Sequence, residues 1–496
     1  MGEAPQGVKI FNGEILIDLT GASGTFHIEW FRSKTDKKVD SGVIAGGDKR
    51  FLKIPVYRWC NSLSLLRADQ SRRCRMRIED LKLKKHADNL RAVATIIWED
   101  CPRPTQELYF ETTEEFAHIL WCDPHAFLVA CIMLAFHFGE ERILIEGEIC
   151  PDLQNGLNTV MNWMRLWWYE PTKNLVEIEG KRRFKFQRPR IPDRAGVFFS
   201  GGIDALATLR ANRISYTSDH PGSIKDGLLV CGLEIEERSV FGYVLDSMSV
   251  LAKDAGIDII PIDTNIRSLG PETNEDFWGN FWLTEFMGAS LSAVAHAFSK
   301  RLTEVSISSC HDIPNVIPYS SHPLINPSYS SSSLRIRHEG ITLSRFEKTK
   351  LVSEWDLALQ HLRVCNKTKL YQADLLNCGK CEKCVRTMLA LEALGVLQKT
   401  GAFPVREVTE DLVKKAVFLS RSNVPLYREL IKPLREAGRQ DLVHAIEQKL
   451  ALFDRPSRSL RALLLQPIIK FDEKRLGGRL RKGKRLISSS GIWAHH

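Results

Sequence analysis

The sequence predicts an α/β protein built on a doubly wound parallel sheet, with an added N-terminal α+β unit and a C-terminal cysteine knuckle. Three observations carry this prediction. Strand-like and helix-like segments alternate from residue 196 onward, as parallel sheets with crossover helices require. A Ser-Gly-Gly turn stands where the first of these strands meets the first helix. Four cysteines then gather between Cys365 and Cys384.

Length and charge bound the organisation of the chain. Its 496 residues allow two or three domains, and its 44% hydrophobic and 26% charged residues are typical of a globular protein with a large core. The net charge of +9 arises from residue 455 onward, where there are 11 basic and 2 acidic residues; the remainder holds 58 of each. We therefore expect a neutral body, in which only the basic tail is a candidate for nucleic-acid contact.

We expect four regions: an N-terminal recognition domain (1–190), a central domain (195–395), a helical extension (396–454) and the basic tail (455–496). Residues 8–60 alternate apolar and polar residues and predict a small β-rich unit. A β/α mixture follows. Its longest apolar run, 126–136, fits a buried helix and is too short to cross a bilayer. No secretory signal is visible, so we expect a cytoplasmic chain without membrane contact.

The basic segment 181–190 predicts a linker, and the alternating region follows it. Strands are predicted at 196–199, 227–232, 258–262 and 304–308, with helices from 205, at 241–255 and at 281–301. Ligands of such sheets bind at the carboxyl ends of the strands. The residues that fall there include Ser200, Cys231, Asp263 and Ser308.

The turn Ser200-Gly201-Gly202 predicts an anion cradle. Glycines allow positive φ and close backbone approach, and the following helix directs free N–H groups at the anion. Phosphate or pyrophosphate of a nucleotide is the expected ligand. The alternative, a hairpin built on Gly-Gly, is disfavoured because a helical pattern rather than a strand follows the turn.

The clustered cysteines predict a metal site. Cys378, Cys381 and Cys384 follow C-x-x-C-x-x-C spacing, with Cys365 thirteen residues upstream. Four thiolates suit a closed tetrahedral Zn2+ site, which leaves no open position and is therefore structural. An iron–sulfur cluster is the second interpretation, and free thiols are the third.

The loop 200–204 and the four cysteines together resemble the 7-cyano-7-deazaguanine synthase branch of the PP-loop ATP pyrophosphatase superfamily, whose sheet is of the HUP-like type. The resemblance covers about 195–395. It implies that ATP adenylates a carboxylate with release of pyrophosphate, and that a nitrogen nucleophile then displaces AMP. Such synthase-like proteins also occur in bacterial anti-phage defence clusters, where the substrate is a macromolecule.

The resemblance also implies residue roles. Ser200, Gly201 and Gly202 cradle the ATP phosphates, and Asp204 binds Mg2+ or orders the loop. Lys348 stands where relatives carry a phosphate-facing lysine, and Arg345 shares that role. Mg2+ is expected because the departing pyrophosphate needs its charge neutralised.

Two departures from the family pattern leave other functions open. Ala205 replaces the second serine of the loop, which removes one hydroxyl, and long segments flank the region of resemblance. A catalytically weakened nucleotide-binding scaffold or sensor that holds a protein partner is therefore the second hypothesis. An RNA-modifying PP-loop enzyme is the third. The neighbouring pair His311-Asp312 is a candidate for acid–base work.

Overall fold

The computed structural model describes residues 75–100, 103–181, 193–269, 275–367 and 375–454, together with the backbone of six N-terminal strands. The basic tail 455–496 and most of the basic linker, 182–192, lie outside the described residues. Among the described helices, none is long and apolar enough to cross a membrane.

The six N-terminal strands form two small antiparallel sheets. One has the order β1 (Val8–Phe11), β2 (Glu14–Asp18) and β5 (Lys49–Leu52). The other has the order β4 (Lys37–Ala45), β3 (Thr25–Arg32) and β6 (Ser62–Ala68). The alternating pattern of this region thus gives strands, as predicted.

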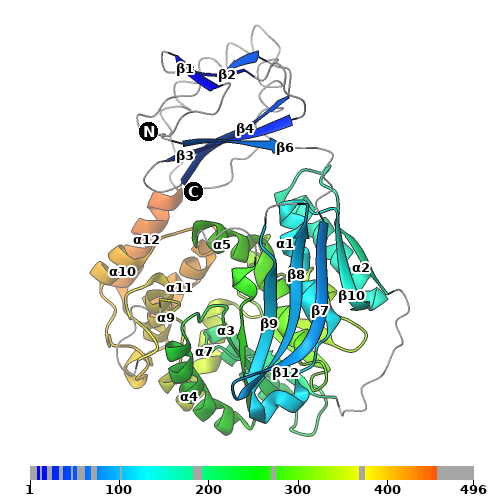
Figure 1. The fold of residues 1–496 in the computed structure, drawn as a ribbon. Helices are drawn as coiled ribbons and strands as arrows, with labels where there is room; N and C mark the ends of the chain where they lie inside the picture. Colours follow the sequence, from blue (N-terminus) through cyan, green and yellow to red (C-terminus); the bar gives the residue numbers. More distant parts are fainter. Residues whose placement is uncertain are drawn as a thin grey trace.

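A ten-stranded sheet organises the rest of the described chain (Figure 1). Its parallel half has the order β14 (Asp258–Thr264), β13 (Ile224–Cys231), β12 (Ala195–Phe198), β15 (Glu304–Ser308) and β16 (Arg335–Glu339). All neighbours in this half run parallel. The chain moves outward from β12 through β13 to β14 and then returns to the other side of β12, so the strand order reverses beside β12.

The other half of the sheet corrects the prediction of a purely parallel sheet. The strands β7 (Arg75–His86), β8 (Asn89–Glu99) and β9 (Gln106–Thr113) are antiparallel neighbours, and β9 continues the sheet antiparallel to β14. The strands β10 (Arg142–Glu148) and β11 (Glu177–Lys181) add in parallel beyond β7. Short connections force antiparallel pairing, because parallel neighbours need a long crossover. One mixed sheet therefore crosses the predicted boundary at residue 190.

Helices cover both faces of the sheet. In β13, Leu228 and Val230 join one hydrophobic core while Leu229 joins the other, as alternating side chains must. The first core holds α1 (Pro124–Phe138), which is buried along nearly its whole length, with α2 (Pro151–Trp168) and α6 (Met287–Ala297). The helix α5 (Glu275–Phe281) continues through a wide turn, Trp282–Phe286, into α6. The predicted helix 281–301 is thus interrupted near its start.

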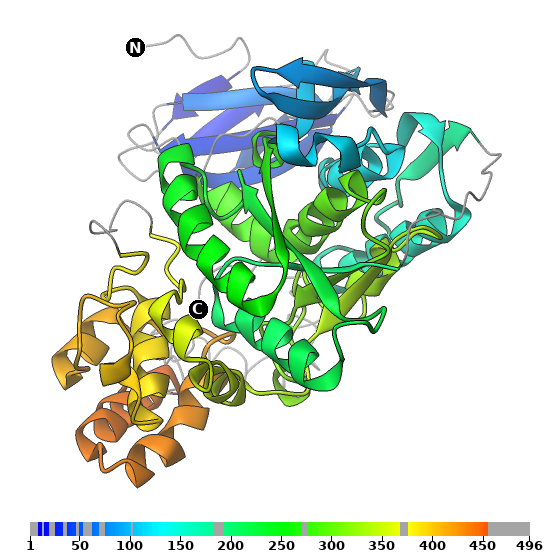
Figure 2. The same ribbon diagram turned by 90° about the horizontal axis from the view of Figure 1, so that it is seen from below.

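The second core holds α3 (Ile203–Ser215), α4 (Arg238–Ala255) and the C-terminal helices. These are α7 (Arg345–Ser353), α8 (Asp356–Gln360), α9 (Glu382–Ala393), α10 (Glu410–Ala416), α11 (Val424–Glu436) and α12 (Gln440–Asp454). In Figure 2 the yellow and orange helices of residues 375–454 gather in one group beside the sheet. The helical pattern of 405–450 is confirmed.

Short helical turns link several of these elements: Glu114–Ile119, Ile266–Ser268, Ile313–Asn315, Asn326–Tyr329 and Leu397–Lys399.

Candidate anion site and cysteine centre

The Ser200–Gly202 loop joins β12 directly to α3, so the helical interpretation of the sequence is confirmed and the hairpin alternative is wrong. Gly201 has φ +76°, and a Cβ there would lie 2.8 Å from the Met248 side chain. Gly202 caps the helix, and its carbonyl accepts from the Leu206 amide at 3.0 Å. The loop therefore needs glycine at 201 and directs the first amides of α3 toward the strand end.

The loop lies where ligands of open α/β sheets bind. It follows the carboxyl end of β12, between the parallel neighbours β13 and β15, where the strand order reverses. A crevice forms at such a position because the connections leave the sheet on opposite faces. The geometry of the fold and the backbone of the loop thus point to the same place.

The three predicted catalytic residues converge at this loop. The Asp204 carboxylate lies 3.1 Å from the Arg345 guanidinium and 3.6 Å from the Lys348 ammonium. Lys348 is 1% exposed and donates to the Ser309 carbonyl at 2.7 Å. The Ser344–Glu347 capping box starts α7 and so fixes the turn that carries both cations. Their roles as ligands of ATP remain predictions.

Further charged groups surround Asp204 that the sequence motifs alone did not single out. Arg363 donates from its backbone amide to the Gly201 carbonyl at 2.9 Å and from its guanidinium to the Ser200 carbonyl at 3.2 Å. Lys383, between two of the clustered cysteines, holds the pKa of Glu234 below its usual range through its charge. These residues stand within or beside the cysteine motif, so that motif was the signal that could have found them.

Two cations, Arg345 and Lys348, share the single carboxylate of Asp204, while Arg386 is paired with Glu382. Clustered cations in a partly dry site favour a polyanion.

Three side chains that can exchange protons, those of Cys310, His311 and Tyr319, follow β15 in the chain. Burial, followed by the charge of Asp204, raises the pKa of the Cys310 thiol, and burial lowers the pKa of His311. Burial also raises the pKa of Tyr319, whose ring meets that of His311 edge-on at 6.3 Å. His311 is therefore neutral at pH 7, as a proton acceptor must be.

Cys231 and Asp263 lie opposite each other at the carboxyl ends of β13 and β14, as predicted. Asp263 accepts from the Tyr109 hydroxyl at 2.6 Å and pairs with Arg238 at 3.2 Å. Burial and the Asp263 carboxylate raise the pKa of Cys231 to about 12. In the described part of the chain these contacts form a cluster distinct from the one around Asp204.

The four predicted cysteines come together and could hold a metal ion. Their sulfur atoms all lie within 4.8 Å of one another, and Cys365, Cys378 and Cys384 are buried. The Sγ–Sγ distances are 3.7 Å (365–381), 3.9 Å (378–384) and 3.4 Å (381–384). A tetrahedral ion with bonds of about 2.3 Å needs edges of about 3.8 Å, so this spacing suits a single ion.

Backbone amides complete the cysteine centre. The amides of Lys380 and Cys381 donate to the Cys378 sulfur, and the Lys367 amide donates to the Cys365 sulfur, at 3.3–3.5 Å. Gly379 has φ +67°, which lets the chain turn between the first two ligands of the motif. Such donors stabilise thiolates and therefore a bound cation.

A second buried group, Asp123, His125 and His296, has metal-ligand chemistry, and hydrogen bonds engage Asp123, His125 and the Nε2 of His296. His125 accepts from the Cys150 amide at Nε2, so its Nδ1 carries the proton that faces Asp123 at 3.0 Å. Ser299 donates to the second oxygen of Asp123. These contacts hold α1 and α6 together, and we interpret the group as structural.

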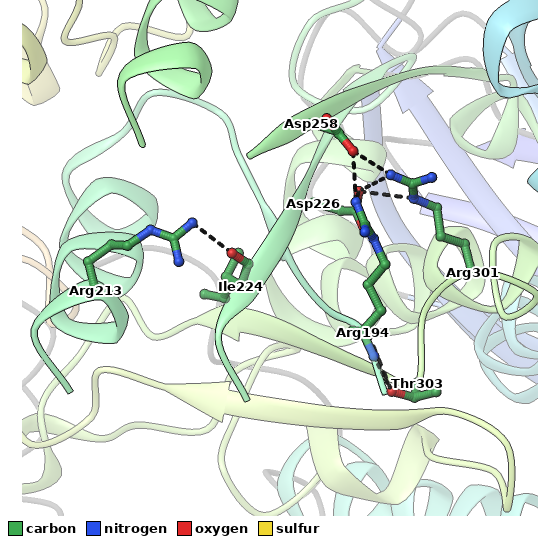
Figure 3. A network of polar contacts seen from close by, with 7 residues as sticks. All are labelled: Arg194, Arg213, Ile224, Asp226, Asp258, Arg301 and Thr303. Atoms are coloured by element: carbon green, nitrogen blue, oxygen red, sulfur yellow. Dashed lines mark hydrogen bonds and ion pairs between the residues drawn. The ribbon is translucent and has the colours of Figure 1, made fainter. Parts of the chain in front are cut away.

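The opposite edge of the sheet is held by ion pairs. Arg194 and Arg301 both donate to the fully buried Asp226 and to the exposed Asp258 (Figure 3). A cavity of about 600 Å³ lies beside them, lined by mixed charges that include Asp193, Lys225 and Lys300. These residues lie at the amino-terminal ends of the parallel strands, away from the Ser200–Gly202 loop. We therefore interpret their ion pairs as stabilising the sheet.

Comparison with known proteins identifies no relative: no protein-family model, no curated protein and no solved structure matches the chain.

Proposed function

We propose that the chain binds ATP at the Ser200–Gly202 loop and uses it to adenylate a carboxylate. One observation carries this proposal: a glycine loop at the carboxyl end of β12 has Asp204, Arg345 and Lys348 within ion-pairing distance beside it. The loop amides suit phosphate oxygens, and the cations suit the charge that develops on a leaving pyrophosphate. The resemblance to PP-loop enzymes adds the reaction class.

The proposed reaction has two steps, and residues of the site can assist each of them. A substrate carboxylate oxygen attacks the α-phosphorus of ATP, the bond to the β-phosphate breaks, and pyrophosphate leaves with its charge against Lys348 and Arg345. A nitrogen nucleophile then attacks the acyl carbon and AMP departs. We assign the proton of that nucleophile to His311, whose pKa burial lowers and which interacts with the charge of Asp204. Bound Mg2+ would supply further charge neutralisation, with Asp204 as the carboxylate placed to hold it.

We propose Zn2+ for the cysteine centre. Four thiolates at tetrahedral spacing leave no open position, so the ion would stabilise the fold rather than take part in the reaction. An iron–sulfur cluster places several iron and sulfide atoms between its thiolates, which sulfur atoms 3.4–3.9 Å apart do not accommodate.

Exchange of labelled pyrophosphate into ATP, measured with a panel of carboxylates, tests the proposal. Carboxylate-dependent exchange supports adenylation. Tight ATP binding with neither exchange nor AMP formation would instead favour the second function, a nucleotide-binding scaffold or sensor. Ala205 is the observation that favours the scaffold, because the loop lacks the hydroxyl that a serine would supply there.

A further inference from the structure

The cysteine centre and the Ser200–Gly202 loop are joined by a short, fully described path. Arg363 contacts the loop with both its backbone amide and its guanidinium, and Cys365 follows two residues later. Arg363 is 3% exposed and Cys365 is fully buried, so neither end of the path is free to move in solvent. The loop that we expect to bind phosphate is thus attached to the metal ligands.

Arg363 shapes the loop in a specific way. It accounts for the carbonyls of both Ser200 and Gly201, at 3.2 and 2.9 Å, and its Cβ packs where a side chain at Gly201 would stand. A backbone nest binds an anion only when its amides point inward, which requires the carbonyls to point away. By holding two successive carbonyls outward, Arg363 presets that orientation.

Asn377 fixes the other end of the path. Its side-chain oxygen accepts from the amides of Val364 and Cys365 at 2.9 and 3.2 Å, and its nitrogen donates to the Leu362 carbonyl at 2.6 Å. Asn377 directly precedes Cys378 and is fully buried. The segment 362–365 is therefore fixed at its end by Cys365 and along its length by the residue that precedes Cys378, so both attachments belong to the cysteine centre.

We propose that Arg363 is the positioning residue of the Ser200–Gly202 loop and that metal at the cysteine centre holds it there, so that metal occupancy controls whether the loop can bind phosphate. Four thiolates this close repel one another unless a cation compensates their charge. Metal loss or oxidation lets Cys365 move, and Arg363 moves with it. The core around α3 and α4 also contains Cys365, Cys378 and Cys384, so the reference for global folding is taken from α1 in the other core.

The proposal rests on the proposed function only in naming phosphate as the ligand, so its primary test does not use ATP. Hydrogen exchange of the full chain is followed in the peptide 199–209, with the buried α1 peptide 126–136 as a reference for global folding. We expect exchange in 199–209 to rise at least 10-fold after chelation of the metal, and to rise by less in Arg363→Met, which keeps its metal and loses only the guanidinium contact to Ser200. Arg363→Lys restores part of the protection. Arg428→Met, on the surface of α11, is the matched control.

Unchanged exchange in 199–209 in Arg363→Met, or in metal-free protein whose α1 stays protected, would overturn the proposal. If chelation unfolds α1 as well, the metal-loaded Arg363→Met variant alone decides. Calorimetric titration with ATP then separates the two ideas. Loaded wild-type protein that fails to bind ATP sinks the proposed function and leaves the loop result standing. Equal ATP affinity of Arg363→Met and wild type sinks the positioning role and leaves the function standing.

Discussion

The ammonium of Lys348 lies 3.6 Å from the carboxylate of Asp204 and is almost completely buried. A buried cation needs compensation, which Asp204 and the Ser309 carbonyl supply in part. Arg345 competes for the same carboxylate. Two cations therefore share one carboxylate beside the Ser200–Gly202 loop, and we expect an incoming anion to compensate them further.

Replacing Lys348 with methionine should weaken ATP binding by about 10- to 100-fold, because one charge-assisted contact is worth about 1.5–3 kcal/mol. The fold should survive, since methionine fills a similar volume. Lys350→Met is the matched control: it lies on the same helix with its side chain exposed, and we expect unchanged affinity. Calorimetric titration measures both. Equal affinities in the two variants would remove Lys348 from the site.

Serine at Cys381 should lower the metal content below one ion per chain. The free energy of unfolding should fall on the order of 3 kcal/mol or more, because metal binding contributes directly to folding. Elemental analysis and urea unfolding measure these effects. Cys122→Ser, outside the centre, should keep the full metal content. A Cys381→Ser protein with normal zinc would refute the ligand set.

The Asp226 pairs at the opposite edge of the sheet predict a stability effect without a binding effect. Asp226→Ala leaves two guanidiniums without their buried partner and should cost about 3–5 kcal/mol. Asp258→Ala removes the exposed partner of the same arginines and should cost less than about 1 kcal/mol. Denaturant unfolding compares the two. Similar costs for both variants would show that burial does not decide the strength of this network.

Stability should fall between pH 6.5 and 4 because of His296. Burial lowers its pKa from 6.5 to about 4 in the folded state, although the Asp123 charge acts in the opposite direction. The unfolded chain therefore binds the proton first, and stability is lost as the pH falls through this window. The shift corresponds to roughly 3 kcal/mol. His296→Gln should flatten the pH dependence of urea unfolding by that amount; an unchanged slope would show that His296 does not titrate this way.

The sequence predicted the parts of the molecule whose signals are local. Gly201 and Gly202 predicted a loop that joins a strand to a helix. The spacing of Cys378, Cys381 and Cys384 predicted that these cysteines share one site. Both patterns result from backbone constraints that act over a few residues. Asp204 and Lys348, 144 residues apart, could be paired only through the resemblance to a family.

The missed features are non-local. The extension of the sheet by β7–β11 depends on the pairing of β9 with β14, and no short pattern encodes which edge a strand will join. No local sequence pattern distinguishes Arg363 from an arginine on the surface. Its importance arises only when α3 and the cysteine centre pack around one core.

Ala205 offers the sharpest test of whether this chain catalyses a reaction. It occupies the first turn of α3 and is 5% exposed, one residue after Asp204. A serine there would restore the second hydroxyl of the loop motif that this chain resembles, and one hydrogen bond from it would contribute about 0.5–1.5 kcal/mol. We expect Ala205→Ser to raise the rate of pyrophosphate exchange up to about 10-fold, with the fold intact. Ala207→Ser, two residues further into the core, should only destabilise. If Ala205→Ser binds ATP more tightly but exchanges no pyrophosphate with any carboxylate, the loop serves a sensor rather than an enzyme.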